Sequence, residues 1–336
     1  MKRALITGGA GFIGFHLAKH LAEQKYNVTI LDNFARGKED REFLELIEKE
    51  NVQFFKGDIT KQETFDELDK LNGEEKFDYV YHLAAINGTE NFYNIPDKVL
   101  KVGVIGTINV LDWFVKQNYG KLLFSSSSEA YAGALKLFGE EFPIPTHENV
   151  PLIVDDPSNV RWSYGASKIL GEVAMHSWAK AHKMEKFSII RYHNIYGPRM
   201  GFEHVIPQFI ERIIKQENPF KIYGGGQGTR TFCYVDDAVR ATQKIMESEE
   251  TNGKTMHIGR DDGEIKIIDM AKELFKVANV EREFVTHEPP KGDVLRRCPN
   301  VDKLKALGFS WNVGLQEGLK KTFDWYKPVF EEREGL

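Results

Sequence analysis

Apolar and polar positions alternate along the first 125 residues in a pattern that predicts strands separated by helices. Short apolar runs predict strands at residues 4–7, 28–31, 52–55, 79–84 and 121–127. The intervening segments with helical periodicity or composition are residues 12–25, 39–50, 60–71 and 94–118. Strands that alternate with helices predict βαβ units, and therefore a parallel sheet with helices on both faces.

The pattern continues to about residue 194 and then changes. A sixth unit is predicted as a helix at 163–182 and a strand at 186–192, whereas prolines and the glycine run at 224–228 interrupt shorter elements beyond it. We therefore expect an α/β fold, with a Rossmann-type, doubly wound parallel sheet in residues 1–194 and a smaller α/β lobe in residues 195–336. The pattern leaves room for part of the later chain to return to the first domain.

The composition narrows the possible functions. With 336 residues and a formal net charge of −5, the chain has no broad basic footprint for nucleic acid. No apolar run approaches the ~18 residues of a membrane helix, and the first residues do not resemble a signal peptide. Cys233 and Cys298 lie far apart and the ten histidines lack ligand spacing, so we expect neither a disulfide framework nor a metal site. A reduced, cytoplasmic protein is the simplest interpretation.

The stretch TGGAGFIG, residues 7–14, joins the first predicted strand to the first predicted helix. In that position Gly8 permits a tight turn, Gly11 lets the backbone approach a pyrophosphate, and Gly14 lets the helix pack on the strand. Asp32 ends the second strand, where a carboxylate accepts hydrogen bonds from a ribose 2′-hydroxyl and repels a 2′-phosphate. The pattern predicts NAD rather than NADP, and a purely structural glycine turn is the alternative.

Two further strand ends fit a dinucleotide. Asp58 is placed to reach the adenine, although it could equally cap the next helix, and the HLAA stretch at 82–85 lets the cofactor lie close to the backbone. We interpret His82 as a core histidine. The predicted NAD-binding residues are Gly8, Gly11, Phe12, Ile13, Gly14, Asp32, Asn33, Asp58, Ile59, Leu83, Ala84, Ala85, Tyr164 and Lys168.

The stretch SYGASK contains a candidate chemical centre. Tyr164 and Lys168 are four residues apart, on one face of a predicted helix. A tyrosine pKa of ~10 must fall for the phenol to act as a base near neutrality, and an adjacent ammonium and the charge of a nicotinamide both lower it. Away from a dinucleotide, such a pair is usually surface decoration.

Several motifs together resemble a known family. TGGAGFIG, Asp32, HLAA, FSSSSEAYA and YGASK, in this order, resemble an extended short-chain dehydrogenase/reductase of the nucleotide-sugar epimerase/dehydratase group. RYHNIYGPR (191–199), GGGQGTRTFCYVDDA (224–238) and KGDVLRRCPNVDK (291–303) extend the resemblance over nearly the whole chain. The resemblance implies an enzyme that holds a nucleoside diphosphate sugar between its lobes and oxidises it, usually at C4, with transient formation of NADH.

The resemblance also assigns roles by position. Ser127 corresponds to the hydroxyl that polarises the reacting sugar oxygen, Tyr164 to the base, and Lys168 to the residue that holds the ribose and lowers the tyrosine pKa. Substrate-binding roles fall to Ser128, to Asn194 and Arg230 at the sugar diphosphate, and to Arg297 or its neighbour Arg296.

The stretch SSSSEAY bears on the net reaction. Dehydrating members usually carry Thr-Asp-Glu, whereas this chain has Ser127-Ser128-Glu129, and a serine is a poor acid for the departing hydroxyl. Decarboxylating members share the Ser-Glu pair and a segment like RWSYGASK (161–168), and use an arginine for the substrate carboxylate, for which Arg297 is the candidate. Epimerases need no further acid or base, and Glu129 would then be only a structural hydrogen-bond acceptor.

We therefore expect a nucleotide-sugar 4-epimerase first. The alternatives are a decarboxylase of a UDP-uronate, a dehydrogenase that releases the 4-keto sugar, a 4,6-dehydratase and, in a different class, a non-catalytic NAD-binding regulator. The retained Ser127, Tyr164 and Lys168 argue against the regulator.

Two further expectations come from the resemblance. The family's usual asparagine in the helix after the fourth strand is replaced by Gly103, which we expect to remove a hydrogen bond and open space near the site. A homodimer is implied, in which residues 94–118 and 163–182 pack against their partners. Its candidate interface residues are Trp113, Phe114, Met175 and Trp178, although the same periodicity is consistent with these side chains facing the sheet.

Overall fold

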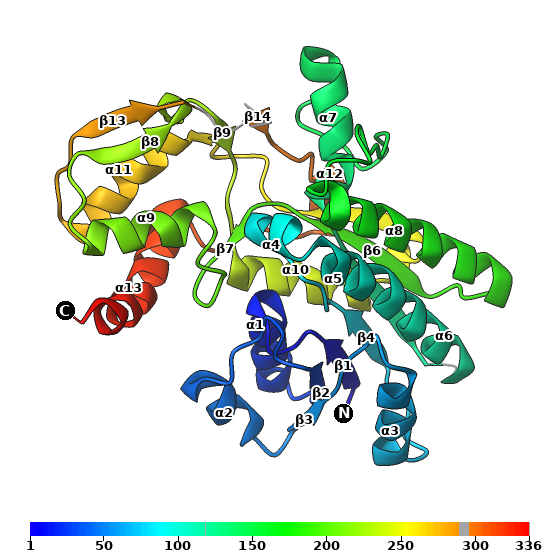
Figure 1. Cartoon of the computed structure of the whole chain (residues 1–336). Helices are drawn as coiled ribbons and strands as arrows, with labels where there is room; N and C mark the ends of the chain where they lie inside the picture. The colour runs from blue at the N-terminus through cyan, green and yellow to red at the C-terminus, as the bar shows by residue number, and fades with distance from the viewer. Residues whose placement is uncertain (118, 289–295, 336) are drawn as a thin grey trace.

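A seven-stranded parallel sheet forms the centre of the computed structural model, which describes residues 1–117, 119–288 and 296–335. Its strand order is β11-β6-β5-β4-β1-β2-β3, and Figure 1 labels β1 to β4 and β6 of this sheet. The strands are β1 (Arg3–Thr7), β2 (Asn27–Asp32), β3 (Val52–Lys56), β4 (Tyr79–His82), β5 (Lys121–Ser127), β6 (Phe187–Tyr192) and β11 (Lys254–Ile258). The predicted Rossmann-type sheet is confirmed.

Helices cover both faces of this sheet because its strands are apolar on both sides. Ile6 of β1 packs in one core cluster and its neighbour Leu5 in the other, as the alternation of side chains along a strand requires. α1 (Phe12–Glu23), α2 (Arg41–Ile47) and α10 (Val235–Glu247) contribute to the first cluster. α3 (Gln62–Asn72), α6 (Thr107–Gln117) and α8 (Trp162–His182) contribute to the second.

The segment predicted as one helix at 94–118 is broken. α4 (Thr89–Asn94) is followed by α5 (Pro96–Leu100), a π-helical turn η1 (Lys101–Gly106) and then α6, while residue 118 lies outside the described residues. Pro96 begins α5 because proline suits the first turn of a helix and not its interior. Within the π-helical turn, the Thr107 hydroxyl donates to the Gly103 carbonyl at 2.7 Å.

The expectation of open space at Gly103 is wrong. A Cβ there would lie 2.5 Å from the Ser167 hydroxyl, so the turn packs directly on α8. Because Gly103 has no side chain, the π-helical turn η1 and α8 approach each other closely at Ser167, the residue before Lys168.

The candidate interface residues also need correction. Trp113, Phe114 and Met175 are at most 3% exposed and pack in the core under α6 and α8. Trp178 packs partly buried against the same cluster and donates to Asp112 at 2.9 Å. These side chains face the sheet, as the alternative held.

In the second lobe, α9, α11 and α13 lie beside the short strands β8 and β13 (Figure 1). The elements of this lobe are α9 (Val205–Ile214), β8 (Phe220–Tyr223), β9 (Thr229–Arg230), β12 (Ile265–Lys266), α11 (Ile267–Ala278), β13 (Phe284–His287), β14 (Arg296–Arg297) and α13 (Leu315–Glu334). The remaining α-helices and β-strands are α7 (Ala132–Phe138), β7 (Ile195–Tyr196), β10 (Cys233–Tyr234) and α12 (Asp302–Ala306).

The chain returns to the first domain after residue 195. β11 pairs with β6 and becomes the edge strand of the central sheet, and α10 packs against α1. Residues 195–336 are therefore not one contiguous lobe, and the return that the sequence left open is present.

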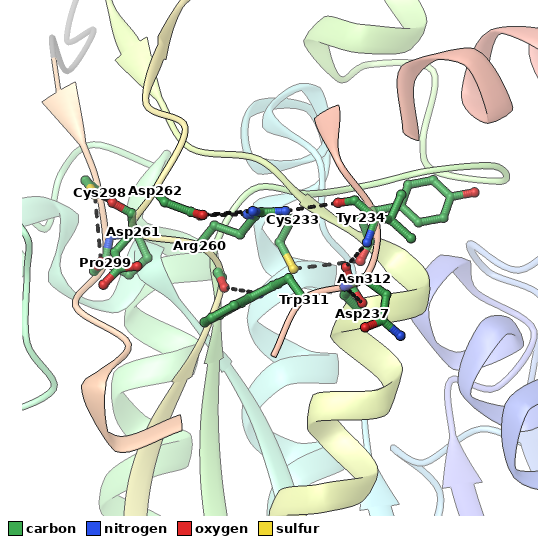
Figure 2. Close-up of polar contacts among 12 residues, drawn as sticks. Cys233, Tyr234, Asp237, Arg260, Asp261, Asp262, Cys298, Pro299, Trp311 and Asn312 are labelled. Carbon is green, nitrogen blue, oxygen red and sulfur yellow. Dashed lines mark hydrogen bonds and ion pairs between the residues drawn. The ribbon is translucent and has the colours of Figure 1, made fainter. Parts of the chain in front are cut away.

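A polar cluster fastens the segment before α13 to this returning chain. Figure 2 shows the polar contacts that Asp237, Arg260 and Trp311 make in this region. The buried Asp237 carboxylate accepts from the backbone N–H groups of Asn312 at 2.9 Å and Val313 at 3.0 Å, and the Arg260 guanidinium donates to the Val313 carbonyl at 3.0 Å. The Trp311 indole N–H donates to the backbone carbonyl that follows β11.

No helix in the described part of the chain is both long and apolar enough to span a membrane.

Acid should destabilise this fold through its buried histidines. His82 joins Thr7 Oγ1 at 2.8 Å and Thr107 Oγ1 at 3.0 Å, and burial lowers its pKa to about 3. Because the unfolded chain binds a proton near pH 6.5, the free energy of unfolding should fall as the pH drops from about 6.5 toward 3, by ~1.4 kcal/mol per pH unit for each such histidine.

Urea unfolding at pH 6.5 and pH 5 tests this prediction. His82→Gln should lose about 2 kcal/mol less than the wild type between the two pH values, since one titrating group has been removed. Identical losses in the two proteins would show that His82 does not contribute to the acid sensitivity.

Candidate active site

A cavity of about 480 Å³ lies at the carboxyl ends of the central strands, where doubly wound sheets bind their ligands. Every predicted site residue lines it except Arg230 and Arg296, the alternative to Arg297. Arg230 lies on β9, next in register to Arg297 on β14, and is not among the lining residues.

The glycine turn forms one end of the cavity. Gly8 has a φ of +74°, and a Cβ there would lie 2.7 Å from Ala84 Cα. A Cβ at Gly14 would lie 2.1 Å from the Gly8 carbonyl oxygen. Both positions therefore require glycine, and α1 begins directly behind the turn with Gly11 as its N-cap. The N-terminus of α1 offers its N–H groups to a phosphate.

Asp32 braces the same turn. Its carboxylate accepts from the backbone N–H of Ala10 at 3.0 Å and from that of Phe34 at 2.7 Å. Burial raises its pKa, and these backbone hydrogen bonds oppose the increase. The carboxylate lines the cavity, where it would repel a 2′-phosphate, so the residues fit NAD.

Asp58 and Asn33 each stabilise a turn after a strand and also face the cavity. The Asp58 carboxylate accepts from the backbone N–H and the hydroxyl of Thr60, both at 2.9 Å. The Asn33 side-chain oxygen accepts from the backbone N–H of Ala35 at 2.9 Å. Each side chain stabilises its own turn and also lines the cavity.

Tyr164 and Lys168 lie on one face of α8, with the Lys168 ammonium 5.5 Å from the tyrosine ring centre. The Lys168 nitrogen donates to the Ser125 carbonyl at 2.7 Å, and burial lowers its pKa to about 7 while Glu172 opposes the decrease. Burial raises the pKa of Tyr164, against a hydrogen bond with Ser127 that lowers it. Burial is the largest of these effects, so the net shift of the Tyr164 pKa is upward.

Ser127 ends β5 and caps the short 3₁₀ helix η2 (Ser128–Tyr131). Its hydroxyl accepts from the backbone N–H of Glu129 at 3.2 Å. The cap points Glu129 into the cavity beside Tyr164, and Ser128 lines the cavity next to it.

Glu129 lies between two arginines. Its carboxylate accepts from Arg297 at 2.6 Å and from Arg161 at 3.2 Å. Burial alone would raise the pKa of Glu129, but the charges and hydrogen bonds of both guanidinium groups hold it below the usual range. Arg296 instead pairs with Glu264, at 2.7 and 2.9 Å, so Arg297 is the member of the pair that faces the site. Positions 291–295 of the predicted motif lie outside the described residues.

Asn194 approaches the cavity in an unusual backbone conformation. Its φ is +45°, and its side-chain amide donates to the Thr231 carbonyl at 2.9 Å. Asparagine tolerates this left-handed region better than most residues. Asn194 is the second residue after β6, and in this conformation it lines the cavity.

Sequence reasoning missed a bridge over the cofactor end of the cavity. Arg36, after β2, forms an ion pair with Glu203, just before α9, and both line the cavity. Arg199 pairs with Asp40 across the same gap. The partners are more than 150 positions apart and belong to no local motif, so only a tertiary contact brings them together.

Ser127, Tyr164 and Lys168 line one cavity with the glycine turn, an arrangement that fits the class of NAD-dependent oxidoreductases. The comparisons then give the family. Residues 4–259 match the profile of the NAD dependent epimerase/dehydratase family, and the chain belongs to it.

Three similar proteins illustrate the range of the family. A UDP-N-acetyl-alpha-D-glucosaminuronate decarboxylase of Bacillus cytotoxicus is 35% identical and aligns over 98% of both chains. The structure of UDP-glucose 4-epimerase from Thermotoga maritima with UDP-glucose superposes with a TM-score of 0.83 at 30% identity, over 98% of this chain and 100% of that one. UDP-glucuronic acid 4-epimerase from Bacillus cereus, solved with UDP-glucuronic acid and NAD, gives 0.83 at 26% identity, over 97% and 99%.

Family membership therefore establishes an NAD-dependent enzyme of nucleotide-sugar chemistry. It does not by itself select a net reaction, because relatives of similar identity include decarboxylases, 4-epimerases and a 4,6-dehydratase.

Tyr164→Phe should separate cofactor binding from chemistry. The variant retains the ring that packs beside the cavity but loses the hydroxyl. We expect NAD content close to that of the wild type and turnover lower by ~10²–10⁴, the usual contribution of a positioned acid or base. Tyr93→Phe, on the exposed surface of α4, is the matched control. Turnover of Tyr164→Phe equal to that of this control would remove the phenol from the mechanism.

Proposed function

We propose that this enzyme oxidises C4 of a nucleoside diphosphate uronic acid and then releases its carboxyl group as carbon dioxide. The observation that supports the proposal is the cluster of Glu129, Arg161 and Arg297 beside Ser127 and Tyr164. The Arg161 and Arg297 guanidinium groups both contact this carboxylate and line the cavity. A guanidinium is the side-chain group whose geometry best matches a carboxylate, and the C6 carboxylate of a uronate is such a ligand.

The residues around the sugar suit each step. NAD would supply the acceptor for the C4 hydride, and the positive charge of its oxidised form would favour ionised Tyr164. In that ionised form the Tyr164 phenolate takes up the proton of the C4 hydroxyl, and the Ser127 hydroxyl orients that oxygen. Arg297 and Arg161 hold the C6 carboxylate.

The oxidised sugar is a β-keto acid. The bond between C5 and C6 breaks, carbon dioxide leaves, and the electron pair moves through C5 to the C4 oxygen. Tyr164 and Ser127 stabilise the developing oxyanion by hydrogen bonds. A proton from solvent then adds at C5. Return of the hydride to C4 and of the Tyr164 proton to the C4 oxygen restores the hydroxyl. The sum is loss of one carbon dioxide for one proton taken up, with the cofactor unchanged.

A 4-epimerase acting on a uronate is the second candidate, and Glu129 favours it. Because the two arginines keep Glu129 ionised, its carboxylate carries no proton for C5. Epimerisation needs no such proton, only return of hydride to the other face of the 4-keto sugar. Dehydration is disfavoured because Ser128 occupies the position at which dehydrating members usually carry an acid.

Product mass distinguishes these reactions. The purified enzyme is incubated, without added reductant, with UDP-, GDP-, CDP- and dTDP-sugars, each as the uronate and as the neutral hexose. We expect a product of a uronate that is lighter by one carbon dioxide. A product of unchanged mass and new retention would identify the epimerase instead. Turnover of neutral hexoses alone would overturn the role of the arginine cluster.

Arg297→Gln tests that role directly. The variant removes a charge-assisted hydrogen bond to the substrate carboxylate, so kcat/KM for the uronate should fall ~10–100-fold. Arg296→Gln is the matched control, since its side chain bonds Glu264 outside the cavity. An equal effect of both substitutions would show that the loss comes from β14 as a whole.

We also propose that the enzyme is a homodimer formed through α5, η1 and α8. Leu100, Ile105, Leu170 and Val173 on these neighbouring helices are each 38–56% exposed. Four apolar side chains on adjoining helices make a surface that a second copy would cover.

Val173→Glu should give a monomer, because a charge would be buried in the dimer. Light scattering during size-exclusion chromatography measures the mass of each variant. Leu71→Glu, equally exposed on α3, should leave the mass unchanged. A wild type that elutes at the mass of one chain would contradict the proposal.

A further inference from the structure

Tyr164 packs in a small apolar cluster of its own, apart from the two cores that cover the central sheet. The cluster consists of Tyr164, Phe92, Ile86 and Val99. Phe92 comes from α4, the short helix after β4, and it also lines the cavity. Its ring lies nearly parallel to that of Tyr164, at 11° with 5.0 Å between the ring centres. Both residues are at most 7% exposed.

We propose that Phe92 is a positioning residue for Tyr164. Its ring fixes the plane of the phenol, so that the hydroxyl stays directed toward Ser127 and the cavity, and it keeps water from that face. This inference rests on the oxidation at C4 that the family performs, and not on the fate of the 4-keto sugar.

The location of Tyr164 explains why such a support is needed. It lies in the first turn of α8 and is followed by Gly165, whose absent side chain leaves room for the Glu129 carbonyl; a Cβ there would lie 3.0 Å away. Gly165 has no side chain that could support the phenol ring from the next position of α8. The phenol oxygen lies at the far end of the side chain, so a small rotation displaces it, and a misplacement of ~1 Å can cost ~10²-fold in rate.

The charges around Tyr164 lie on elements other than α4. Lys168 lies on its own helix, Glu129 on η2, and Arg161 and Arg297 reach Glu129 from outside the ring contact. α4 and α5 present the apolar Phe92 and Val99. Replacing Phe92 thus changes hydration and orientation of the phenol without changing the local charge. Burial is the leading cause of the raised pKa of Tyr164, so admitting water should lower that pKa.

The test compares Phe92→Leu with Phe92→Tyr in the NAD-loaded enzyme, using whichever nucleotide sugar the wild type turns over. We expect Phe92→Leu to lower kcat ~10–100-fold, to change KM less than ~2-fold, and to shift the acidic limb of the kcat profile to lower pH. NAD content should match that of the wild type. Phe92→Tyr keeps the stacked ring and should restore most of kcat.

Phe65→Leu is the control for lost packing alone. Phe65 is a fully buried ring in the core under α3, away from Tyr164, so its loss should reduce stability with little change in kcat. A second readout needs no substrate: the ultraviolet absorbance of the ionised phenol, followed during alkaline titration and corrected by Tyr164→Phe, should show a lower midpoint in Phe92→Leu.

Equal loss of kcat in Phe92→Leu and Phe65→Leu, or no rescue by Phe92→Tyr, would overturn the inference. An unchanged titration midpoint would overturn its water-exclusion part. A wild type inactive on every uronate but active on another nucleotide sugar would contradict the proposed function and leave this test intact.

Discussion

The closeness of α1 to β1 is the constraint on which the site depends. The helix can begin directly behind the strand only because Gly14 lies against the Gly8 carbonyl, and β4 can approach the turn only because Gly8 lies against Ala84. Asp32 then bonds the turn from the third side. The ends of β1, β2 and β4 are thereby held around the N-terminus of α1. The cavity left there suits a dinucleotide, and α8 forms another part of its lining.

Burial disfavours the charged forms of both Lys168 and Glu129, which line the same cavity. Lys168 has a carbonyl oxygen as its direct partner, so desolvation dominates and its pKa falls to about 7. Glu129 has two guanidinium partners, which outweigh the same desolvation and keep it ionised. The different partners therefore account for the different outcomes.

Local patterns predicted the parts of the site that local sequence determines. The glycine turn, the residues at strand ends and the i, i+4 pair of Tyr164 and Lys168 each depend on a few neighbouring positions, and the structure places them around one cavity. The ion pair of Arg36 with Glu203 and the stacking of Phe92 on Tyr164 depend on long-range contacts and left no local signal.

Two other errors have physical reasons of their own. Trp113 was an ambiguous interface candidate because the apolar stripe of a helix that covers a sheet looks the same whichever neighbour it packs against. The break before α6 was missed because apolar spacing in residues 94–118 cannot distinguish a regular helix from one with a π-helical turn.

The return of β11 to the sheet also governs the order in which the protein can be completed during synthesis. β6 is buried along its whole length, yet its neighbour on one side is a strand that ends at residue 258. A nascent chain that has emerged only as far as residue 194 would carry β6 as an unpaired apolar edge, the kind of strand that invites pairing with another chain. About sixty more residues, including part of the second lobe, must leave the ribosome before β11 can cover that edge. The central sheet can therefore be completed only after this part of the second lobe has been synthesised.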